Sequence, residues 1–208
     1  MNEIRVLIIE DQTLTRIGIR TVLEQTGEIE VVGESESWAE GFQTFQALRP
    51  EVTLISLRLP GFCAVDVLKD FFAIEPKAKI IILAAYPGDA EISRSLHGGA
   101  LGYILKDASA DDLVKAVRTV SAGKKFIPAE VAGVLSENLG SEELTPSEQR
   151  ILEKIVVGQS NKEIARDLDV TENTVKTHVK NILAKLGVSD RTAAATSAIR
   201  RGIVRVDF

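Results

Sequence analysis

Charged and polar residues follow apolar runs of this sequence at the positions where buried strands would end. Four of them follow or close such runs: Glu10, Asp11, Ser56 and Lys106. Nearly unbroken apolar runs that end in turn residues are typical of strands buried on both faces. Parallel strands of an open α/β sheet end at one edge, where such folds place their chemistry. The sequence therefore predicts that carboxylates, a hydroxyl and an ammonium group meet at one sheet edge.

This set of positions resembles the receiver domain of two-component response regulators, in which an aspartate accepts a phosphoryl group. By this resemblance, Glu10 and Asp11 match the acidic pair and Ser56 matches the acceptor aspartate. Ala84 matches the position of a threonine or serine in the family, Tyr103 matches the switch aromatic, and Lys106 matches the lysine of the phosphorylation site. Ser56 and Ala84 therefore have the wrong residue types for handling a phosphoryl group.

The chemistry of phosphoryl transfer explains why these two departures matter. A carboxylate attacks phosphorus while Mg²⁺ and a lysine neutralise the developing charge. A serine hydroxyl without an adjacent general base is a far weaker nucleophile. Mg²⁺ prefers hard oxygen ligands, so the loss of one carboxylate leaves at most a weak residual site at Glu10 and Asp11. We expect no metal, no other cofactor and no catalytic residue, and hence a pseudo-receiver rather than an enzyme.

Other interpretations of these residues remain open. Two independent departures, at Ser56 and Ala84, favour a natural pseudo-receiver over one engineered substitution. Phosphorylation of the Ser56 hydroxyl is a weaker alternative, because no kinase recognition stretch surrounds it. Glu10, Asp11 and Lys106 are expected to form a structural ion pair at the sheet edge. Tyr103 is expected to be a packed aromatic rather than a working switch.

Strand and helix patterns alternate along the first part of the chain. The expected strands are 4–9, 30–33, 52–56, 80–83 and 102–105, and the expected helices are 14–25, 39–48, 65–74, 90–98 and 111–122. This alternation predicts an α/β fold, a doubly wound, five-stranded parallel sheet with helices on both faces. The resemblance implies the flavodoxin-like (βα)5 form of that fold.

The 208 residues are enough for two modest domains of roughly 100 to 200 residues each. We expect a receiver-like domain at 1–122, a linker at 123–143 and a four-helix domain at 144–208. Within the linker, 128–139 is expected to form a short helix, and 140–143 a flexible hinge.

The second domain is marked by helix-start signals. Thr145-Pro146-Ser147-Glu148 is a capping box with proline at the first helical position, and Ser160-Asn161-Lys162-Glu163 is a second capping box. Thr171 can cap a third helix. The turn before it contains Asp169, a residue type that tolerates the left-handed conformation.

The third helix has two contrasting faces. Its apolar side contains Val175, Val179, Ile182, Leu183 and Leu186, and its polar side contains Asn173, Lys176, Thr177 and Lys180. A packed face backed by a basic, polar face is what a recognition helix needs in a major groove. For the lysines alone, the simpler alternative is a solvated helix face.

The segment 144–204 resembles the LuxR-type helix-turn-helix, through Ser160 to Ala165 and Thr174 to Val179. A glycine is common at the turn position that Asp169 occupies. The resemblance implies base contacts from Lys176, Thr177 and Lys180. It implies phosphate contacts, which position the protein without reading sequence, from Thr174, His178, Asn181, Lys185 and Arg191. His178 has no metal-ligand partner at suitable spacing.

Charge is unevenly distributed along the chain. From Thr145 onward there are 11 Lys and Arg and 8 Asp and Glu, a net of +3, and because the whole chain is −5, residues 1–144 carry −8. The basic part would be drawn to DNA through counterion release.

No apolar run approaches the ~18 residues of a membrane span, no signal peptide is expected, and Cys63 is the one cysteine. We therefore expect a cytoplasmic protein without membrane contact.

Together the two parts resemble a NarL/FixJ-type response regulator with an atypical receiver. This implies a sequence-specific transcription regulator that binds double-stranded DNA as a homodimer, through the small-residue helix at 191–201. Packing of those alanines inside their own domain is the alternative. DNA binding is expected to be independent of aspartyl phosphorylation, with a sensor protein or small ligand as a further partner of the receiver. The alternative function is a protein-interaction module that sequesters another regulator, a sensor or a ligand.

Overall fold

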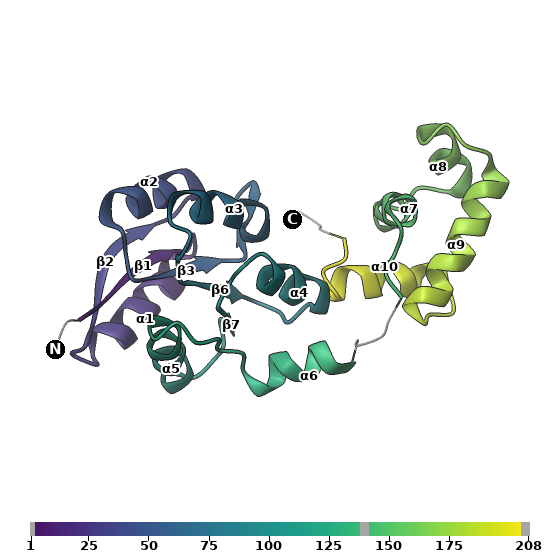
Figure 1. Cartoon of the computed structure of the whole chain (residues 1–208). Coiled ribbons are helices and arrows are strands. Elements are labelled where there is room, and N and C mark those ends of the chain that lie inside the picture. The colour runs from purple at the N-terminus through teal and green to yellow at the C-terminus, as the bar shows by residue number, and fades with distance from the viewer. Residues whose placement is uncertain (1–2, 138–141, 205–208) are drawn as a thin grey trace. The chain divides into compact units, whose positions relative to one another are not determined.

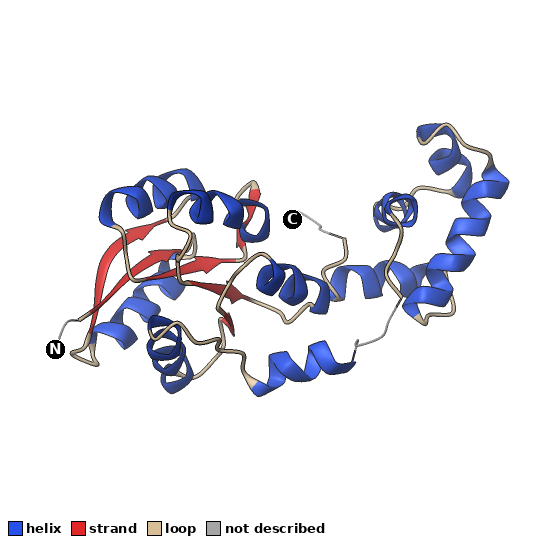
Figure 2. Ribbon diagram, in the orientation of Figure 1, coloured by secondary structure: helices blue, strands red, loops and turns tan. Residues whose placement is uncertain are grey.

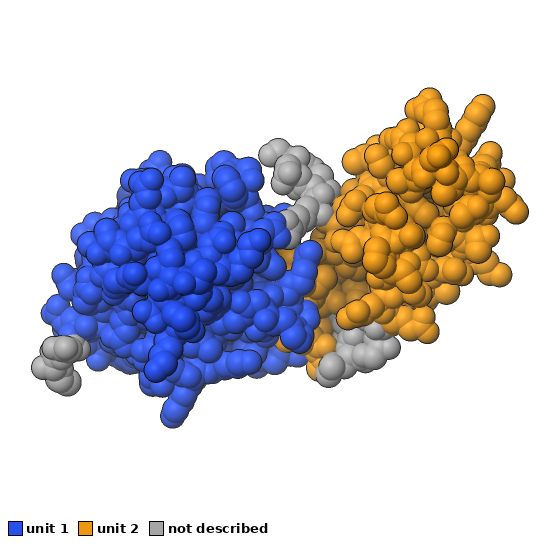
Figure 3. All heavy atoms as spheres, turned by 45° about the horizontal axis from the view of Figure 1, so that its top comes forward, with its two compact units in different colours: residues 1–87, 92–133 blue, residues 88–91, 134–208 orange. Residues whose placement is uncertain are grey.

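The computed structural model describes residues 3–137 and 142–204 of the chain (Figure 1). They form two compact units, coloured separately in Figure 3. One unit consists of Met1–Pro87 and Ile92–Gly133, and the other of Gly88–Glu91 and Val134–Phe208. Among the described residues, no helix is both long and apolar enough to cross a membrane.

A five-stranded sheet forms the centre of the first unit. Its strands are β1 (Ile4–Ile9), β2 (Ile29–Ser35), β3 (Val52–Ser56), β6 (Ile80–Ala84) and β7 (Gly102–Leu105). They lie in the order β2-β1-β3-β6-β7, and every neighbouring pair is parallel. The reversal of strand order at β1 and β3 is the mark of a doubly wound sheet. The predicted flavodoxin-like fold is confirmed, and all five predicted strands are present.

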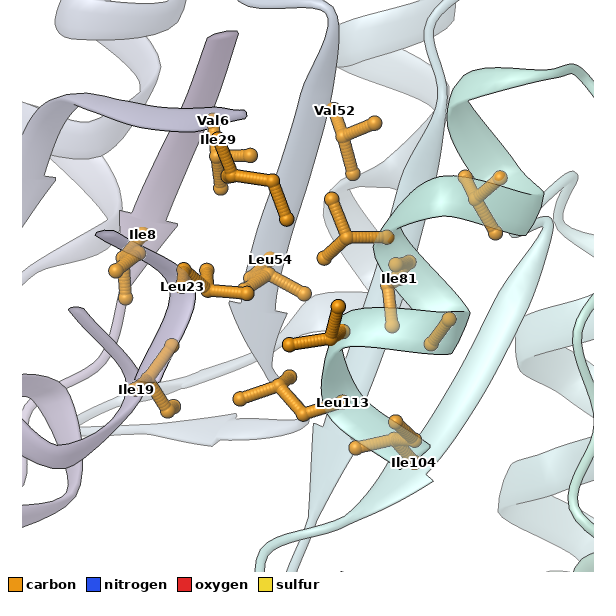
Figure 4. Close-up of a cluster of buried hydrophobic side chains, with 14 of the residues drawn as sticks. Val6, Ile8, Ile19, Leu23, Ile29, Val52, Leu54, Ile81, Ile104 and Leu113 are labelled. Atoms are coloured by element: carbon orange, nitrogen blue, oxygen red, sulfur yellow. The ribbon is translucent and has the colours of Figure 1, made fainter. Parts of the chain in front are cut away.

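Strands β3, β6 and β7 are buried along their whole length because helices cover both faces of the sheet (Figure 2). The helices of this region are α1 (Thr13–Glu24), α2 (Trp38–Leu48), α3 (Ala64–Ile74), α4 (Asp89–His97) and α5 (Ala110–Ser121). Alternate residues of a strand point to opposite faces. Val6 and Ile8 of β1 therefore join the same buried cluster as Leu54 of β3, together with residues of α1 and α5 (Figure 4). On the other side of the sheet, α2 and α3 bring together an aromatic group: Trp38, Phe42, Phe45 and Phe71.

A short hairpin follows β3, where the sequence predicts only a turn. Its strands, β4 (Arg58–Leu59) and β5 (Phe62–Cys63), pair in the antiparallel sense. Pro60 and Gly61 connect them, and Gly61 has a φ of 73°. Proline followed by a residue with positive φ is the signature of a type II turn, which requires glycine at that place. The hairpin lies directly after Ser56 and so forms one wall around it.

A single helix, α6 (Ala129–Glu137), occupies the region expected to link the two domains. The helix expected at 128–139 is present over these residues, and the last two residues of that range lie outside the described part of the chain. The hinge expected at 140–143 also falls partly on residues that are not described.

Four helices form the C-terminal unit: α7 (Pro146–Val156), α8 (Asn161–Asp167), α9 (Glu172–Leu186) and α10 (Arg191–Arg200). Both predicted capping boxes are confirmed. The side chains of Thr145 and Ser160 each accept the backbone N–H of the Glu three residues on, and each donates its own backbone N–H to the carboxylate of that Glu. Thr171 caps α9 by accepting the N–H of Thr174, also as predicted. These local bonds satisfy N–H groups that would otherwise lack partners at a helix start.

The packed face of α9 holds the C-terminal unit together. Val175 and Ile182 are fully buried, and Val179, Leu183 and Leu186 pack around them. They meet apolar residues of the other three helices: Ile151, Leu152 and Ile155 of α7, Ile164 and Ala165 of α8, and Ala194 and Ala198 of α10. The predicted four-helix domain therefore has its own hydrophobic core.

Asp169, in the turn between α8 and α9, has a φ of 54°. The left-handed region strains residues that have a Cβ, and Asp tolerates it better than Ala does. We expect Asp169→Ala to lower the free energy of unfolding of the C-terminal unit by about 1 kcal/mol, while Asp169→Gly leaves it unchanged or slightly higher. Far-UV circular dichroism during urea unfolding would measure both. Equal losses for the two variants would show that the carboxylate, and not the backbone conformation, matters.

Candidate functional site

Strand register brings the predicted residues of the first unit to one edge of the sheet. Ser56 is paired with Leu83, and Ala84 is paired with Leu105. Backbone hydrogen bonds continue past the strand ends, from the N–H of Lys106 to the carbonyl of Ala84 at 2.8 Å. Glu10 and Lys106 directly follow the last residues of β1 and β7. The carboxyl ends of four neighbouring strands therefore supply Glu10, Ser56, Ala84 and Lys106.

Ser56 is buried at the end of the central strand, and its hydroxyl already has a partner. The Oγ atom donates a hydrogen bond of 2.9 Å to the backbone carbonyl of Arg58, in the hairpin that follows. Among the described residues, no histidine or carboxylate forms a hydrogen bond with this hydroxyl, so none of them serves it as a general base. Ala84, at the end of β6, is also buried.

Glu10 and Lys106 form a buried ion pair at this edge. The Lys106 Nζ atom lies 2.9 Å from Oε1 and 2.8 Å from Oε2 of Glu10, which has no exposed surface. The backbone N–H of Gln12 also donates to Oε1, at 3.0 Å. Oε2 takes part in the ion pair without a well-aligned hydrogen bond. The lysine and one carboxylate are therefore engaged with each other.

The oxygen donors at this edge do not fit Mg²⁺. This ion requires near-octahedral oxygen coordination, with one or two carboxylates directed at it. Glu10 is neutralised by Lys106, Ser56 offers a neutral hydroxyl that points to a carbonyl, and Asp11 is the remaining carboxylate. In the described part of the chain, no group of three or more His, Cys, Asp or Glu residues could hold a metal ion.

Tyr103 is fully buried inside the sheet, on β7. Its hydroxyl lies 3.5 Å from the backbone carbonyl of Tyr86, at the limit of a hydrogen bond. A phenol that is enclosed in this way is held by packing, because movement to the surface would open a cavity behind it.

Arg16 also belongs to this edge, although the sequence analysis did not single it out. Its guanidinium is almost entirely buried and donates to the backbone carbonyl of Glu10 at 2.6 Å. It also pairs with Glu36 at 2.5 Å and lies 3.8 Å from Glu34. Arg16 thus connects α1 to the end of β2 and to Glu10, the partner of Lys106. An arginine among the apolar positions of a helix, followed by two glutamates in a strand, is the signal that could have revealed it.

The polar face of α9 is exposed on the second unit. Lys176, Thr177 and Lys180 all lie at the surface, together with Asn173. Lys176 has 59% of its side chain exposed and pairs with Glu172, one turn earlier, at 3.0 Å. Thr177 donates to the carbonyl of Asn173 at 3.1 Å. Surface ion pairs of this kind contribute less than about 1 kcal/mol, so Lys176 can exchange Glu172 for another anion at little cost.

The residues expected to contact phosphate differ in their surroundings. Thr174 and Asn181 are exposed, and the Thr174 hydroxyl lies 2.8 Å from that of Thr171. His178 is partly buried, and its Nδ1 atom is enclosed without a hydrogen-bond partner in the described structure.

Lys185 is engaged inside the unit. Its Nζ atom donates to Oε2 of Glu148 and to the backbone carbonyl of Glu143, both at 2.9 Å. Glu148 is also the capping-box residue of α7, and its side chain is only 4% exposed. Burial raises the pKa of the Glu148 carboxyl, but hydrogen bonds from Thr145 and Lys185 outweigh it, so the pKa lies below its ordinary value. The pair joins the start of α7 to the end of α9.

Arg191 is also held by its own unit, at the start of α10. Its guanidinium donates to Oδ1 of Asn161 at 3.1 Å and to the backbone carbonyl of Gln159. Burial lowers the pKa of this guanidinium below its ordinary value. These bonds fix α10 against the start of α8. Of the eight residues considered for DNA contact, Lys176, Lys185 and Arg191 have intramolecular partners for their cationic groups, and the pair of Lys176 lies at the surface.

The alanines of α10 are buried or partly buried, and Ala195 also packs against the core of its own unit. Ala194 and Ala198 are fully buried and pack inside their own unit, which is the alternative raised by the sequence. Ile199 remains 43% exposed.

Two family models match this chain. One, described as "Response regulator receiver domain", covers residues 6–118, and the other, described as "Bacterial regulatory proteins, luxR family", covers residues 142–198. Together they account for both units.

Known proteins resemble the chain over nearly its whole length. The transcriptional regulatory protein LiaR of Bacillus subtilis is 40% identical over 209 residues, covering 97% of this chain and 99% of LiaR. A structure of RcsB from Salmonella enterica serovar Typhimurium, bound to promoter P1flhDC in the presence of the phosphomimetic BeF3−, is 30% identical. It has a TM-score of 0.76 and covers 94% of this chain and 98% of that one. A structure of two RcsB dimers on two parallel DNAs has a TM-score of 0.75 at 28% identity, with 96% and 99% coverage.

Proposed function

Because this chain belongs to the NarL/FixJ family of response regulators, we propose that it is a sequence-specific DNA-binding transcription regulator that works without aspartyl phosphorylation. The observation that supports DNA binding best is the exposed Lys176, Thr177 and Lys180 face of α9, opposite a buried apolar face. Such a helix can enter a major groove while its other side stays packed. The similar RcsB is seen bound to DNA.

Lys176, Thr177 and Lys180 are assigned to base edges, and Thr174, His178 and Asn181 to phosphates. Lys185 and Arg191 already have partners within the unit, so their part in DNA binding is to hold the ends of α9 and α10 in place. If they reach phosphates, they do so while keeping these bonds. The proposed functional division of the chain is a receiver-like domain at 1–122, a linker at 123–143 and a DNA-binding domain at 144–208.

Independence from phosphorylation is supported by the state of the sheet edge. The acceptor position holds a serine whose hydroxyl is bonded to a carbonyl, and the lysine is paired with Glu10. A phosphoryl group would need a nucleophile, a bound cation and a free lysine at this place. In this arrangement Ser56 is a neutral hydroxyl bonded to a carbonyl, Lys106 is engaged by Glu10, and the oxygen donors suit a divalent cation poorly. The pseudo-receiver then serves as a rigid partner domain.

We propose a homodimer on two half-sites, because one small helix-turn-helix contacts too few bases for useful specificity. The RcsB dimers on DNA support this arrangement. A DNA target is in keeping with the cytoplasmic location expected from the sequence, and the similar LiaR is named as a transcriptional regulator rather than an enzyme.

The second candidate function is sequestration of another regulator, a sensor or a small ligand by the pseudo-receiver. The ion pair of Glu10 with Lys106 at the sheet edge supports it, because a receiver that does not carry out phosphoryl chemistry can still serve as a binding domain. Sequestration would survive the loss of Lys176 and Lys180, whereas DNA binding would not.

The test of the proposed function is selection from a randomised duplex pool with the unmodified full-length protein. The segment 144–208 is tested beside it. Recovery of the same two-half-site sequence by both, without a phosphodonor, supports a constitutively competent dimeric regulator. Recovery by neither protein would rule out sequence-specific binding.

Incubation of the full-length protein with acetyl phosphate and Mg²⁺ is expected to leave its mass unchanged and its DNA affinity within twofold. The reason is the neutral, engaged hydroxyl of Ser56. Intact-mass spectrometry and a binding titration measure the two results. A Ser56→Asp variant is the matched probe, since it restores a third carboxylate and is expected to bind Mg²⁺ more tightly by calorimetry. A stable phosphoprotein with tighter DNA binding would refute phosphorylation independence.

A further inference from the structure

A small hollow in the C-terminal unit lies between α7 and the N-terminal half of α9. Its volume is about 80 Å³, far below the ~300 to 1,000 Å³ of pockets that enclose drug-sized ligands. Its polar lining consists of Ser147, Arg150, Thr174 and His178, and its apolar lining of Ile151, Leu168 and Val170. The hollow therefore suits one small polar group rather than a metabolite.

The charges around this hollow favour an anion. Arg150 is exposed and is the one charged residue of the lining, which contains no carboxylate. Three carboxylates are adjacent in sequence to the lining residues. That of Glu148 is neutralised by Lys185 and by the bonds of the capping box, that of Asp167 pairs with Lys154 and Arg166, and Asp169 is exposed. Arg150 forms no hydrogen bond or ion pair with the residues that the structure describes, so its guanidinium is available to a ligand.

Two polar groups of the lining lack partners in the described structure. The Nδ1 atom of His178 is buried and unpaired, although buried polar atoms in native proteins generally have a partner. Ser147 is the second residue of α7, an 11-residue helix. Pro146 has no N–H and the N–H of Glu148 is capped by Thr145, so the N–H of Ser147 is the one in this turn without a carbonyl partner within the helix. Such N–H groups and the helix dipole attract anions. An imidazole nitrogen, a hydroxyl and a guanidinium thus surround one small space.

We propose that this hollow holds a phosphate group of the DNA backbone. Arg150 and Ser147 of α7 then contact the DNA strand that lies beside α9. The inference rests on the proposed DNA-binding function and deepens it. Thr174 and His178 are one turn apart, on the flank of α9 between its exposed base-facing side and its buried side. When a helix lies in the major groove, its flanks face the phosphate walls. The contact positions the helix and reads no sequence.

The test measures the dissociation constant of full-length Arg150→Ala across a series of salt concentrations. The duplexes are the one recovered by selection and an unrelated one. Loss of one phosphate contact lowers the slope of log K against log salt by about 0.9, which corresponds to roughly fivefold weaker binding at 0.15 M salt. We expect this loss on both duplexes equally. Arg150→Lys keeps the positive charge and is expected to retain the slope of log K against log salt. Lys125→Ala removes one positive charge at an exposed linker position and is the matched control for charge.

A second measurement identifies the source of the phosphate. The ring signals of His178 in nuclear magnetic resonance spectra are followed during titration with the duplex and, separately, with inorganic phosphate. We expect the duplex to shift them and millimolar inorganic phosphate to leave them in place. Saturation by inorganic phosphate alone would overturn the assignment to DNA.

The two proposals fail in distinguishable ways. If the wild-type protein binds the duplex and a folded Arg150→Ala variant binds it with the same affinity and salt slope, the phosphate site is wrong and the proposed function stands. If the wild-type protein binds no duplex, the proposed function is wrong, and the phosphate site with it.

Discussion

Replacing both Lys176 and Lys180 with alanine is expected to weaken binding to the selected duplex by about 100-fold or more. A side chain that reads a base edge contributes ~1 to 3 kcal/mol of discrimination, which is roughly 5-fold to 150-fold for each lysine. Both side chains are exposed on α9 and have no role in its packed face. The variant should therefore stay folded. Fluorescence anisotropy with a labelled duplex measures the affinity.

The matched control removes two exposed lysines elsewhere, through Lys115→Ala and Lys124→Ala. It changes the net charge by the same amount at positions away from α9, so only a small loss of affinity is expected. Equal losses in the two double variants would mean that general charge, and not the α9 face, attracts the DNA. Full retention of affinity in the α9 variant would favour the sequestering function.

Replacing Glu148 with glutamine is expected to destabilise the C-terminal unit by about 3 kcal/mol. The change leaves Lys185 without its charged partner at a site where only 18% of the lysine side chain is exposed. It also weakens the capping box of α7, because the carboxylate accepts the Thr145 N–H at 2.8 Å. For a unit of this size, such a loss lowers Tm by about 12 °C or more. Thermal melting followed by far-UV circular dichroism measures it.

The aromatic residues make the two units separable in this experiment. Trp38 is the single tryptophan, and both tyrosines, Tyr86 and Tyr103, also lie outside 144–208. Tryptophan fluorescence therefore reports on the receiver-like unit, while helical ellipticity reports on both units. Glu148→Gln should lower the ellipticity transition and leave the fluorescence transition in place.

Acidification should have a related effect on the wild-type protein. The pKa of Glu148 in the folded unit lies below the ordinary value of 4.5. A lowered pKa stabilises the folded state at pH values above 4.5, and this contribution is lost as the pH falls through the folded-state pKa. The C-terminal unit of the wild type should therefore lose stability below about pH 4.5, and the Glu148→Gln variant should lose less over the same range.

Two further variants test whether the ion pair is the cause. Glu153→Gln changes an exposed glutamate of the same helix and should alter stability by less than about 0.5 kcal/mol. Lys185→Met removes the cation while keeping an apolar stem, so the double variant with Glu148→Gln should be more stable than additivity of the single changes predicts. Strict additivity would show that the capping box alone is responsible.

The sequence by itself determined the elements that depend on near neighbours. Capping boxes at Thr145 and Ser160 are complete within four residues, so the starts of α7 and α8 were predictable. The ends of the strands were also predictable from the sequence, because the apolar runs end close to the residues at which the strands end. Position within those runs also placed Ser56 and Ala84 at the ends of β3 and β6, where the structure has them.

Only the tertiary structure decided what the charged side chains do. Lys185 meets Glu148 across 37 positions, Arg191 meets Asn161 across 30, and Lys106 meets Glu10 across 96. A residue's type and local pattern do not identify a partner at such distances, since packing of the helices and the sheet brings the two together. The same reason explains why the buried role of Arg16 and the hollow beside Arg150 were not predicted. Local hydrogen bonds and periodicity are encoded in neighbouring residues, whereas an ion pair or a binding site is set by the three-dimensional arrangement of the elements.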